Sequence, residues 1–292
     1  MPETHWESGR LDGRRGPQRL LFGRVYEDSA IEAKAFPAGS RIVCIASAGC
    51  TAIDLSANHT VTAVDLNPVQ LEYARRRAAG GPVEPGMAER GMALGRRMLR
   101  LAGWRPALVE AFLQLDDPAV QAGFWHDRLE TRRFRFLVDN LLRLSVLRAV
   151  YATPLLQVLP APFGPVLRAR MRRCWSRHPN RSNPYARALL AGDSSSAGRK
   201  ALSPIRFVCT DLASFLETRP AGSFDGFSFS NILDGAGPGY RERLFQAAQH
   251  TGTAGSKVVH RSFAASGPEV GMNRAADDRS FLWGIVSVVP LH

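Results

Sequence analysis

The sequence predicts an α/β protein whose sheet domain is assembled from both ends of the chain around a large all-α insertion. Three observations predict this class. Short β-branched runs alternate with helical segments before residue 85 and again after residue 200. Between these two regions, apolar residues recur at helical spacing, accompanied by many prolines and arginines. The chain has 292 residues, of which 45% are hydrophobic, and this is enough to bury a sizeable core.

The first part of the predicted sheet domain begins with a buried strand that ends in a turn of small residues. The expected elements are a strand at 41–45, a helix at 51–58, a strand at 61–64 and a helix at 69–79. Asn67 and Pro68 supply a capping side chain and a helix-opening proline before the second helix. Strand, turn, helix, strand, helix is the beginning of a doubly wound domain.

The second part resumes the alternation after the helical region. The expected elements are a strand at 205–209, a helix at 211–217, a strand at 224–229, a helix at 240–249, a strand at 257–260 and a β-rich run at 282–289. The chain is therefore divided into 1–85 and 201–292, which form the α/β domain, and 86–200, which form the helical insertion between its second and third strands. The Gly- and Ser-rich residues 192–198 are expected to be a flexible linker.

The net charge of +12 is located almost entirely in the predicted insertion. Lys and Arg total 38 against 26 Asp and Glu, and all but three of these cations are arginine. Residues 87–200 hold 20 Arg or Lys and 8 Asp or Glu. A basic block of this kind indicates a polyanionic partner, either a phospholipid surface or nucleic acid. The alternative is a codon bias that fills solvated helix faces with arginine.

Other features of the sequence exclude several classes. No apolar run reaches the roughly 18 residues that a bilayer span needs. Residues 1–24 lack the apolar core of a signal peptide, so a cytoplasmic protein is expected. Peripheral association with a membrane is compatible with this expectation. The cysteines have neither CxxC nor zinc-finger spacing, so no disulfide framework and no metal site is expected; they are Cys44, Cys50, Cys174 and Cys209.

The turn after the first strand is the first candidate binding element. Residues 46–51 are small, so backbone N–H groups can approach a ligand closely. Asp65 lies 20 residues beyond the end of that strand, where an acidic side chain can accept hydrogen bonds from both ribose hydroxyls. With Gly49 as its only glycine, the turn suits a nucleoside better than a dinucleotide, and S-adenosylmethionine fits that description. The alternative is a tight turn followed by a capping aspartate.

Later strand ends carry further polar candidates. Asp211 is placed to accept from an adenine amino group, or else only caps the following helix. Asn231 and Asp234 follow the fourth strand, at the sheet edge where ligands bind, with helix capping as the alternative. Arg261 ends the fifth strand and is expected to pair with a substrate carboxylate or with a surface acid.

Four segments resemble the BtaA-type family, the S-adenosylmethionine:diacylglycerol 3-amino-3-carboxypropyltransferases that begin betaine-lipid synthesis. They are IASAGC at 45–50, VDLNPVQ at 64–70, FSFSNI at 227–232 and DRSFLWG at 278–284. The tripeptide at 26–28 also resembles the N-terminal segment of that family, and the likeness extends over residues 22–285. Thr51 stands where the family usually has Asn, and the chain is shorter than typical members, which leaves the acceptor open.

The resemblance implies a Rossmann-like sheet of the class I methyltransferase type with S-adenosylmethionine as substrate and no metal. The implied cofactor-binding residues are Ala46, Ser47, Gly49, Asp65, Leu66, Asn67, Gln70, Asp211, Leu212, Ser230, Asn231 and Arg261. A hydroxyl acceptor needs a general base near neutral pH. By position the candidates are Glu27, Asp28, Asp234 and His260, with Tyr26 shaping the pocket.

The resulting prediction is a transferase that moves the 3-amino-3-carboxypropyl group to a lipid hydroxyl or a small-molecule acceptor and releases methylthioadenosine. The alternatives are a methyltransferase and an intramolecular cyclisation of S-adenosylmethionine to a cyclic amino acid. A third, of another class, is an arginine-rich nucleic-acid-binding protein. The aromatic residues of the insertion are mixed into apolar helical faces, so most of them are expected to form a core rather than a base-stacking surface. An anionic membrane surface therefore ranks above nucleic acid as a partner.

Overall fold

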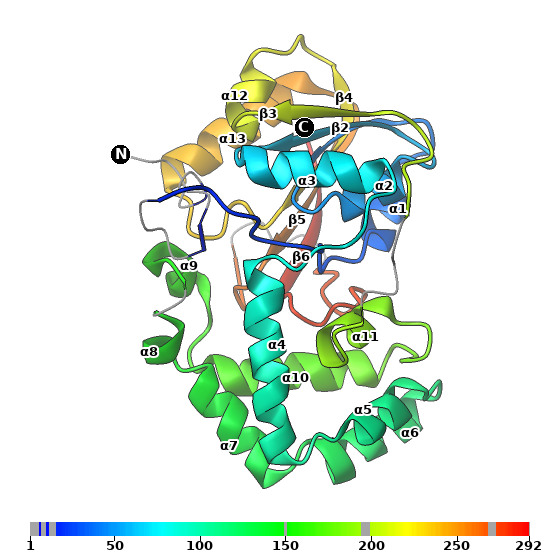
Figure 1. Cartoon of the computed structure of the whole chain (residues 1–292). Coiled ribbons are helices and arrows are strands. Elements are labelled where there is room, and N and C mark those ends of the chain that lie inside the picture. The colour runs from blue at the N-terminus through cyan, green and yellow to red at the C-terminus, as the bar shows by residue number, and fades with distance from the viewer. Residues whose placement is uncertain are drawn as a thin grey trace.

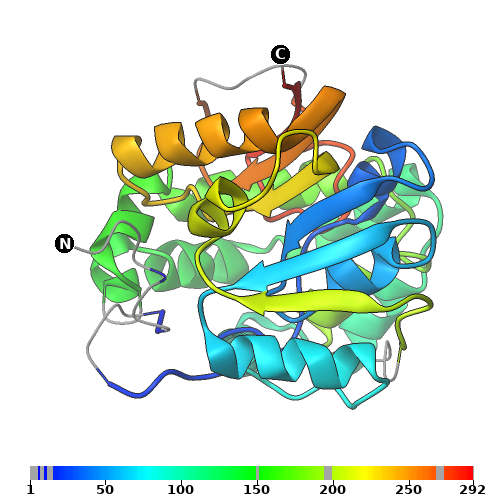
Figure 2. The same ribbon diagram turned by 90° about the horizontal axis from the view of Figure 1, so that it is seen from above.

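A six-stranded, mostly parallel sheet organises the upper half of the molecule (Figures 1 and 2). The computed structural model describes residues 6, 10–11, 16–148, 151–193, 199–267 and 273–291. In those residues the strands are β1 (Arg41–Ile45), β2 (Thr60–Asp65), β3 (Ile205–Cys209), β4 (Phe224–Ser230), β5 (Gly252–Ser262) and β6 (Ile285–Pro290). Their order is β3-β2-β1-β4-β5-β6, and only β6 runs antiparallel to its neighbour. This is the strand order of a Rossmann-like sheet, so the predicted α/β class is confirmed.

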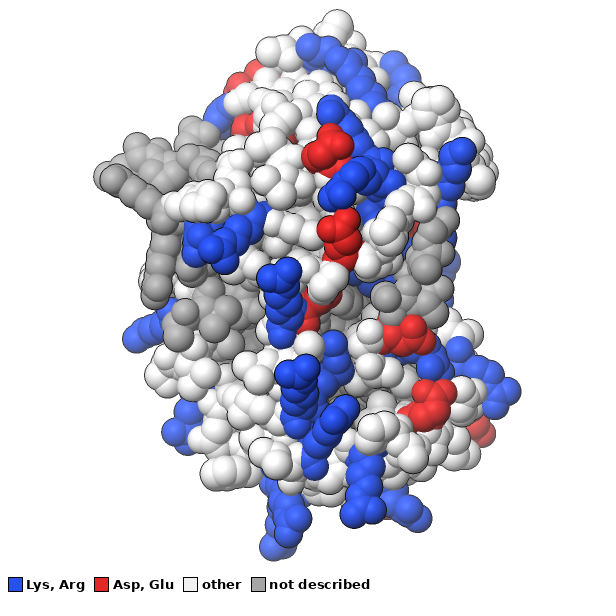
Figure 3. Space-filling view, in the orientation of Figure 1, with Lys and Arg blue, Asp and Glu red and all other residues white. Residues whose placement is uncertain are grey.

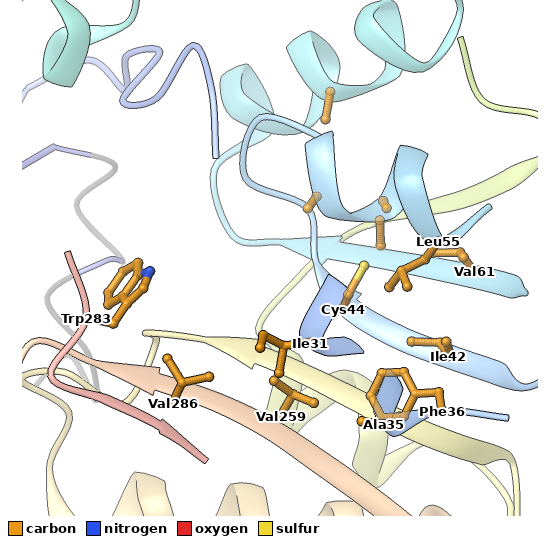
Figure 4. Packing of buried hydrophobic residues seen from close by; sticks show 14 of the residues in the cluster. Ile31, Ala35, Phe36, Ile42, Cys44, Leu55, Val61, Val259, Trp283 and Val286 are labelled. Atoms are coloured by element: carbon orange, nitrogen blue, oxygen red, sulfur yellow. The ribbon is translucent and has the colours of Figure 1, made fainter. Parts of the chain in front are cut away.

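Helices cover both faces of the sheet and bury its β-branched side chains. One face is covered by α1 (Ala30–Ala35), α2 (Cys50–Leu55) and α3 (Pro68–Ala78), and the other by α12 (Leu212–Glu217) and α13 (Pro238–Thr251). Figure 4 shows the first of these cores, in which Ile31 of α1 and Leu55 of α2 lie over Val61 and Val259 of the sheet. The sheet is therefore enclosed on both faces, as parallel sheets are.

The predicted start of α3 is confirmed by its cap. Asn67 Oδ1 accepts hydrogen bonds from the backbone N–H groups of Val69, at 3.0 Å, and Gln70, at 3.3 Å. Pro68 stands at the first helical position, where a missing N–H costs nothing. The sequence of this loop therefore fixes both the end of β2 and the direction of α3.

The residues between α3 and β3 form a bundle of short helices, called here the helical segment (87–190), which lies below the sheet in Figure 1. Its elements are α4 (Met87–Leu99), η2 (Arg100–Ala102), α5 (Pro106–Leu113), α6 (Pro118–Phe124), η3 (Trp125–Leu129), α7 (Arg132–Leu141), α8 (Leu144–Leu147), α9 (Thr153–Val158), α10 (Phe163–Trp175) and α11 (Pro184–Leu190). Several prolines open these helices rather than interrupt them, at Pro106, Pro118, Pro154 and Pro184.

The helical segment has its own aromatic core. Trp104 stacks on Phe134 with ring centroids 4.7 Å apart, and Trp125 and Trp175 pack around Phe112. All five side chains are buried, which confirms that these aromatic residues of the segment form a core. Among the described residues, no helix combines the length and the apolar character that a membrane span requires.

Two arginines of α10 join the helical segment to the sheet domain. Arg170 donates hydrogen bonds to the backbone carbonyls of Leu282, at 2.6 Å, and Phe263, at 2.8 Å. Arg173 donates to the carbonyl of Trp283 at 3.0 Å. Part of the arginine excess is therefore used inside the molecule. Of the expected linker at 192–198, residues 194–198 lie outside the described residues.

Candidate functional site

The carboxyl edge of the sheet holds a partly open cavity, called here the edge cavity, whose space amounts to about 700 Å³ including the part open to solvent. Its lining comes from residues at or just after the ends of β1 to β4, from the start of α3 and α12, and from α13. In an open α/β sheet this edge is where ligands bind. The structure brings together here nine of the predicted cofactor residues: Ser47, Asp65, Leu66, Asn67, Gln70, Asp211, Leu212, Ser230 and Asn231.

Asp65 is held in a fixed orientation at the centre of this edge. Its Oδ2 accepts a hydrogen bond from the backbone N–H of Ser47, and its Oδ1 accepts one from that of Asn67, both at 2.9 Å. Burial raises the pKa of Asp65 to about 6, and these backbone hydrogen bonds oppose the rise. Each carboxylate oxygen keeps further acceptor capacity, so both can receive hydrogen bonds from a ligand hydroxyl.

Asp211 caps α12 and also lines the edge cavity. Its Oδ2 accepts from the backbone N–H of Ser214 at 2.8 Å, which confirms the capping interpretation. Its Oδ1 accepts from the Tyr240 hydroxyl at 2.6 Å. Burial, together with the hydrogen bond and charge of Asp211, raises the pKa of Tyr240. Tyr240 lies on α13, and no local pattern marked it as a site residue.

An N-terminal strap, residues 19–29, contributes to the lining of the edge cavity and is held by the first turn of α3 and its cap. Gln70 Oε1 accepts from the backbone N–H groups of Leu21 and Phe22, at 3.0 and 3.1 Å, and its Nε2 donates to the Phe22 carbonyl at 2.8 Å. Asn67 Nδ2 donates to the carbonyl of Arg19 at 2.8 Å. Gln70 and Asn67 therefore position the strap, whose Phe22 lines the cavity. The sequence did not reveal this role.

A second and larger cavity adjoins the first and is called here the apolar cavity; its space amounts to about 1220 Å³ including the part open to solvent. It lies between the strap, the helical segment and the chain that precedes β6. Its apolar lining includes Val25, Met92, Leu142, Leu147, Leu155, Leu159, Phe163, Leu167, Phe263 and Leu282. Both cavities share Trp6, Phe22, Ser47, Ser230 and Asn231 as lining residues, so they meet at the ends of β1 and β4.

Glu27 lies at this junction. Its carboxylate accepts a hydrogen bond from the Ser230 hydroxyl, and its Oε2 lies 3.4 Å from Arg261 Nη1. Burial raises the pKa of Glu27 to about 7, although Arg261 and Ser230 oppose the rise. A carboxyl group with this pKa exchanges a proton near neutral pH, as a general base must.

Tyr26 and Asp28 flank Glu27 but have different environments. Tyr26 lines the apolar cavity, and burial and the charge of Glu89 raise the pKa of its phenol. Asp28 accepts hydrogen bonds from Arg279 at Nε, at 2.5 Å, and at Nη2, at 2.8 Å. Burial alone would raise the pKa of Asp28, but Arg279 outweighs it and holds the pKa below the usual value. Asp28 is therefore an ion-pair partner and a poor base, which corrects its candidacy.

The structure corrects both expectations for Arg261. Its side chain is fully buried, donates to both carboxylate oxygens of Glu32, at 2.5 and 3.0 Å, and donates to Asp278 Oδ2 at 3.2 Å. It lines neither the edge cavity nor the apolar cavity. Buried acids therefore surround the guanidinium of Arg261, which links β5 to α1 through Glu32 and to the loop that contains Asp278. Enclosed in this way, Arg261 reaches neither a substrate carboxylate nor a surface acid.

Asp234 and His260 lie away from the junction, around a separate cavity of about 440 Å³. Asp234 accepts from the Ser262 hydroxyl at 2.5 Å and from the backbone N–H of Phe263 at 3.0 Å, so it does not cap a helix. Burial, with the charges of Arg241 and Arg261, lowers the pKa of His260 to about 3. The structure therefore places both residues outside the linings of the edge cavity and the apolar cavity.

Ala46 and Gly49 shape the turn and do not line the edge cavity. Gly49 has φ +80°, and a Cβ there would lie 3.3 Å from the Ala74 side chain. Only glycine combines this backbone conformation with so close an approach of α3. These two predicted cofactor residues therefore act through the backbone, by holding Ser47 beside Asp65.

The chain matches no family model, no curated protein and no solved structure. The fold and the site therefore define a class only: an α/β protein with a mostly parallel, Rossmann-like sheet and a cavity at its carboxyl edge. Within the described ranges, no three His, Cys, Asp or Glu side chains gather in a way that would hold a metal ion. The cysteines are free, with Cys44, Cys50 and Cys174 buried and Cys209 exposed.

Proposed function

We propose that this protein transfers the 3-amino-3-carboxypropyl group of S-adenosylmethionine to the hydroxyl group of an apolar, lipid-like acceptor and releases methylthioadenosine. The observation that carries the proposal is the junction of two unlike cavities, one polar at Asp65 and the other apolar, with Glu27 beside the point where they meet. The resemblance of four sequence segments to the aminocarboxypropyltransferase family supports the same reaction.

The edge cavity fits the nucleoside part of S-adenosylmethionine. Asp65 offers two oriented acceptor oxygens for ribose hydroxyls, and Ile45, Val64, Leu212 and Ile232 provide an apolar lining suited to the faces of a purine ring. Asp211 lies at the same cavity with both oxygens engaged by the chain, so its proposed contact with the adenine amino group would add a further hydrogen bond. The proposed fold is accordingly a class I methyltransferase-type sheet with the helical segment as an insertion.

The apolar cavity indicates the kind of acceptor. A lining composed mainly of Leu, Phe and Met side chains favours hydrocarbon, because burial of such surface contributes about 25 cal/mol per Å². A soluble polar acceptor would gain little from it, and an intramolecular cyclisation would leave it without a role. The acceptor chain would lie among α4 and α7 to α10 and present its hydroxyl toward the strap.

Bound S-adenosylmethionine would supply a sulfonium-activated carbon and a neutral thioether leaving group. Glu27 would take the proton of the acceptor hydroxyl while the hydroxyl oxygen bonds to that carbon and the carbon–sulfur bond breaks. The Ser230 hydroxyl donates to Glu27 and orients its carboxylate. Tyr26, whose pKa is raised, remains a neutral phenol that shapes the wall of the apolar cavity.

A product assay tests the proposal and separates it from its alternatives. The full chain is incubated with S-adenosylmethionine labelled in the aminocarboxypropyl group, with and without detergent-dispersed diacylglycerol. We expect methylthioadenosine and a labelled lipid only when the acceptor is present. S-adenosylhomocysteine as the sole nucleoside product would identify a methyltransferase instead, and a labelled cyclic amino acid without acceptor would identify the cyclisation. Either result would overturn the proposed transfer.

A further inference from the structure

The arginines of the helical segment divide into two groups by location. Those of α10 and α11 are paired or hydrogen-bonded within the molecule, for example Arg172 to Glu130 and Arg187 to Glu110. In the described part of the chain, no ion pair or side-chain hydrogen bond is recorded for a second group: Arg90, Arg97, Arg100, Arg105, Arg128, Arg132, Arg133, Arg135, Arg143 and Arg148. Figure 3 shows basic side chains along α4 and at the end of the molecule away from the sheet. The charge that is free for a partner is therefore concentrated there.

Two large apolar side chains protrude at that same end. Leu101, in η2, is 77% exposed, and Phe136, in α7, is 72% exposed. They line one shallow hollow of about 690 Å³ together with Arg132 and Arg133. These four residues are called here the end patch. Exposed Leu and Phe surrounded by unpaired arginines match the composition of interfacial membrane-binding surfaces.

We propose that the end patch docks the protein on an anionic phospholipid surface, with Leu101 and Phe136 inserted at the boundary between headgroups and acyl chains. Arg132 and Arg133 then lie at the level of the lipid phosphates. Each basic side chain near such a surface strengthens binding about fivefold. Inserting the two apolar side chains removes them from water, which arginine–phosphate pairing alone does not require.

A lipid surface explains the patch better than nucleic acid does. Recognition of single strands relies on aromatic platforms, and the other large aromatic side chains near this end, Trp104 and Phe134, are buried in the core. Leu101 has no flat ring on which a base could stack. Its exposure beside the arginines is therefore a feature that an acyl-chain boundary uses and a nucleic acid does not.

The patch is connected to the apolar cavity by a single helix. Phe136 lies within α7, and Leu142, which follows the last residue of that helix, lines the cavity. A protein docked through the end patch therefore holds its acceptor cavity close to the membrane. The docking proposal rests on the proposed function and adds to it that the lipid acceptor comes from the membrane. The test of docking requires no catalytic activity.

The test is co-sedimentation of the full-length protein with vesicles of phosphatidylcholine alone or mixed with phosphatidylserine. We expect binding to the mixed vesicles that weakens as salt is added. Leu101→Ser with Phe136→Ser should weaken it by about tenfold or more, and Arg132→Gln with Arg133→Gln by about 25-fold. Matched controls outside the patch are Leu202→Ser, on a side chain 78% exposed, and Arg206→Gln with Arg219→Gln on the sheet domain.

Three outcomes would overturn the proposal: no binding to mixed vesicles, equal losses in the patch and control variants, or binding that the serine variants leave unchanged. Binding of a single-stranded oligonucleotide that depends on the arginines but not on Leu101 would assign the patch to nucleic acid. Because all four side chains are at the surface, unchanged thermal unfolding should accompany every variant. If vesicle binding holds while no methylthioadenosine is released from S-adenosylmethionine in the presence of detergent-dispersed acceptor, the proposed function fails and the docking surface stands.

Discussion

At the residue scale, two carboxylates with raised pKa values have different tasks because their surroundings differ. Asp65 is oriented by the backbone N–H groups of Ser47 and Asn67 and faces the edge cavity. Glu27 is oriented by the Ser230 hydroxyl and faces the apolar cavity. Burial raises both pKa values, that of Glu27 to about 7 and that of Asp65 to about 6. The different surroundings are the reason why we propose ligand binding for Asp65 and proton transfer for Glu27.

Replacing Asp65 by alanine should abolish measurable binding of S-adenosylmethionine. The substitution removes two charged hydrogen bonds to ribose, each worth about 1.5 to 3 kcal/mol, so affinity should fall at least about 100-fold. Isothermal titration calorimetry measures this directly. Asp225→Ala is the control, because Asp225 pairs with Arg41 at the opposite end of the sheet. Unchanged affinity in Asp65→Ala would reject its role at the ribose.

Glu27→Gln should lower the transfer rate by about 100-fold or more and remove a titration from the pH–rate profile. In the wild type the carboxyl group holds its proton below its pKa of about 7, so activity should rise as the pH passes upward through 7. Initial rates measured across this pH range show the rise, and Glu72→Gln, at an exposed residue, is the control. The same rise of the rate near pH 7 in Glu27→Gln would exclude Glu27 as the base.

The same pKa shift predicts how stability depends on pH. Between pH 4.5 and about 7 the folded protein binds a proton at Glu27 that the unfolded chain releases. Stability contributed by this group therefore increases as the pH falls through that window and is lost as the pH rises through 7.

At the scale of elements, buried ion pairs hold the site together across long stretches of sequence. Arg261 of β5 binds Glu32 of α1 and Asp278, and Arg279 binds Asp28 of the strap. Glu27 lies between these pairs, so its position depends on three segments far apart in the chain. An N-terminal strap fixed in this way keeps Glu27 beside Ser230 at the end of β4.

Arg261→Met should strongly destabilise the fold, because it leaves Glu32 and Asp278 buried without a counter-charge. Breaking a buried pair in this way costs about 3 to 5 kcal/mol. Urea unfolding followed by far-ultraviolet circular dichroism measures the loss. Arg41→Met, which breaks the exposed pair with Asp225, should shift the midpoint far less. Similar shifts in the two variants would contradict the structural role assigned to Arg261.

At the scale of the whole molecule, one cavity lies at the edge of the sheet and the other lies between the sheet domain and the helical segment, and the proposed reaction requires both. Filling the apolar cavity should therefore impair transfer to the lipid without impairing the binding of S-adenosylmethionine. Met92→Trp adds bulk on α4 inside this cavity and should reduce lipid labelling at least about tenfold while S-adenosylmethionine affinity is retained. Met98→Trp on the same helix is the control, since Met98 does not line the cavity. An equal loss of cofactor affinity would show that the cavities are not separate sites.

Local patterns in the sequence were sufficient for much of the sheet domain. The β-branched runs predicted β1 and β3 with the bounds that the structure has, and Asn67 with Pro68 predicted the start of α3. Asp65 and Asp211 could be placed at the edge cavity because parallel strands end at a common edge. These features depend on residues that are adjacent in the chain, so they can be predicted from the sequence alone.

Contacts between distant residues decided the rest. The sequence alone placed the arginine excess in residues 87–200, but only the tertiary structure divided those arginines between internal pairs and the exposed end patch. Likewise, the sequence offered Glu27, Asp28, Asp234 and His260 as equivalent bases. The structure gives Glu27 and Asp28 partners more than 200 residues away and places Asp234 and His260 at a different cavity. A side chain's pKa and accessibility depend on everything packed around it, and that environment exists only once the chain has folded.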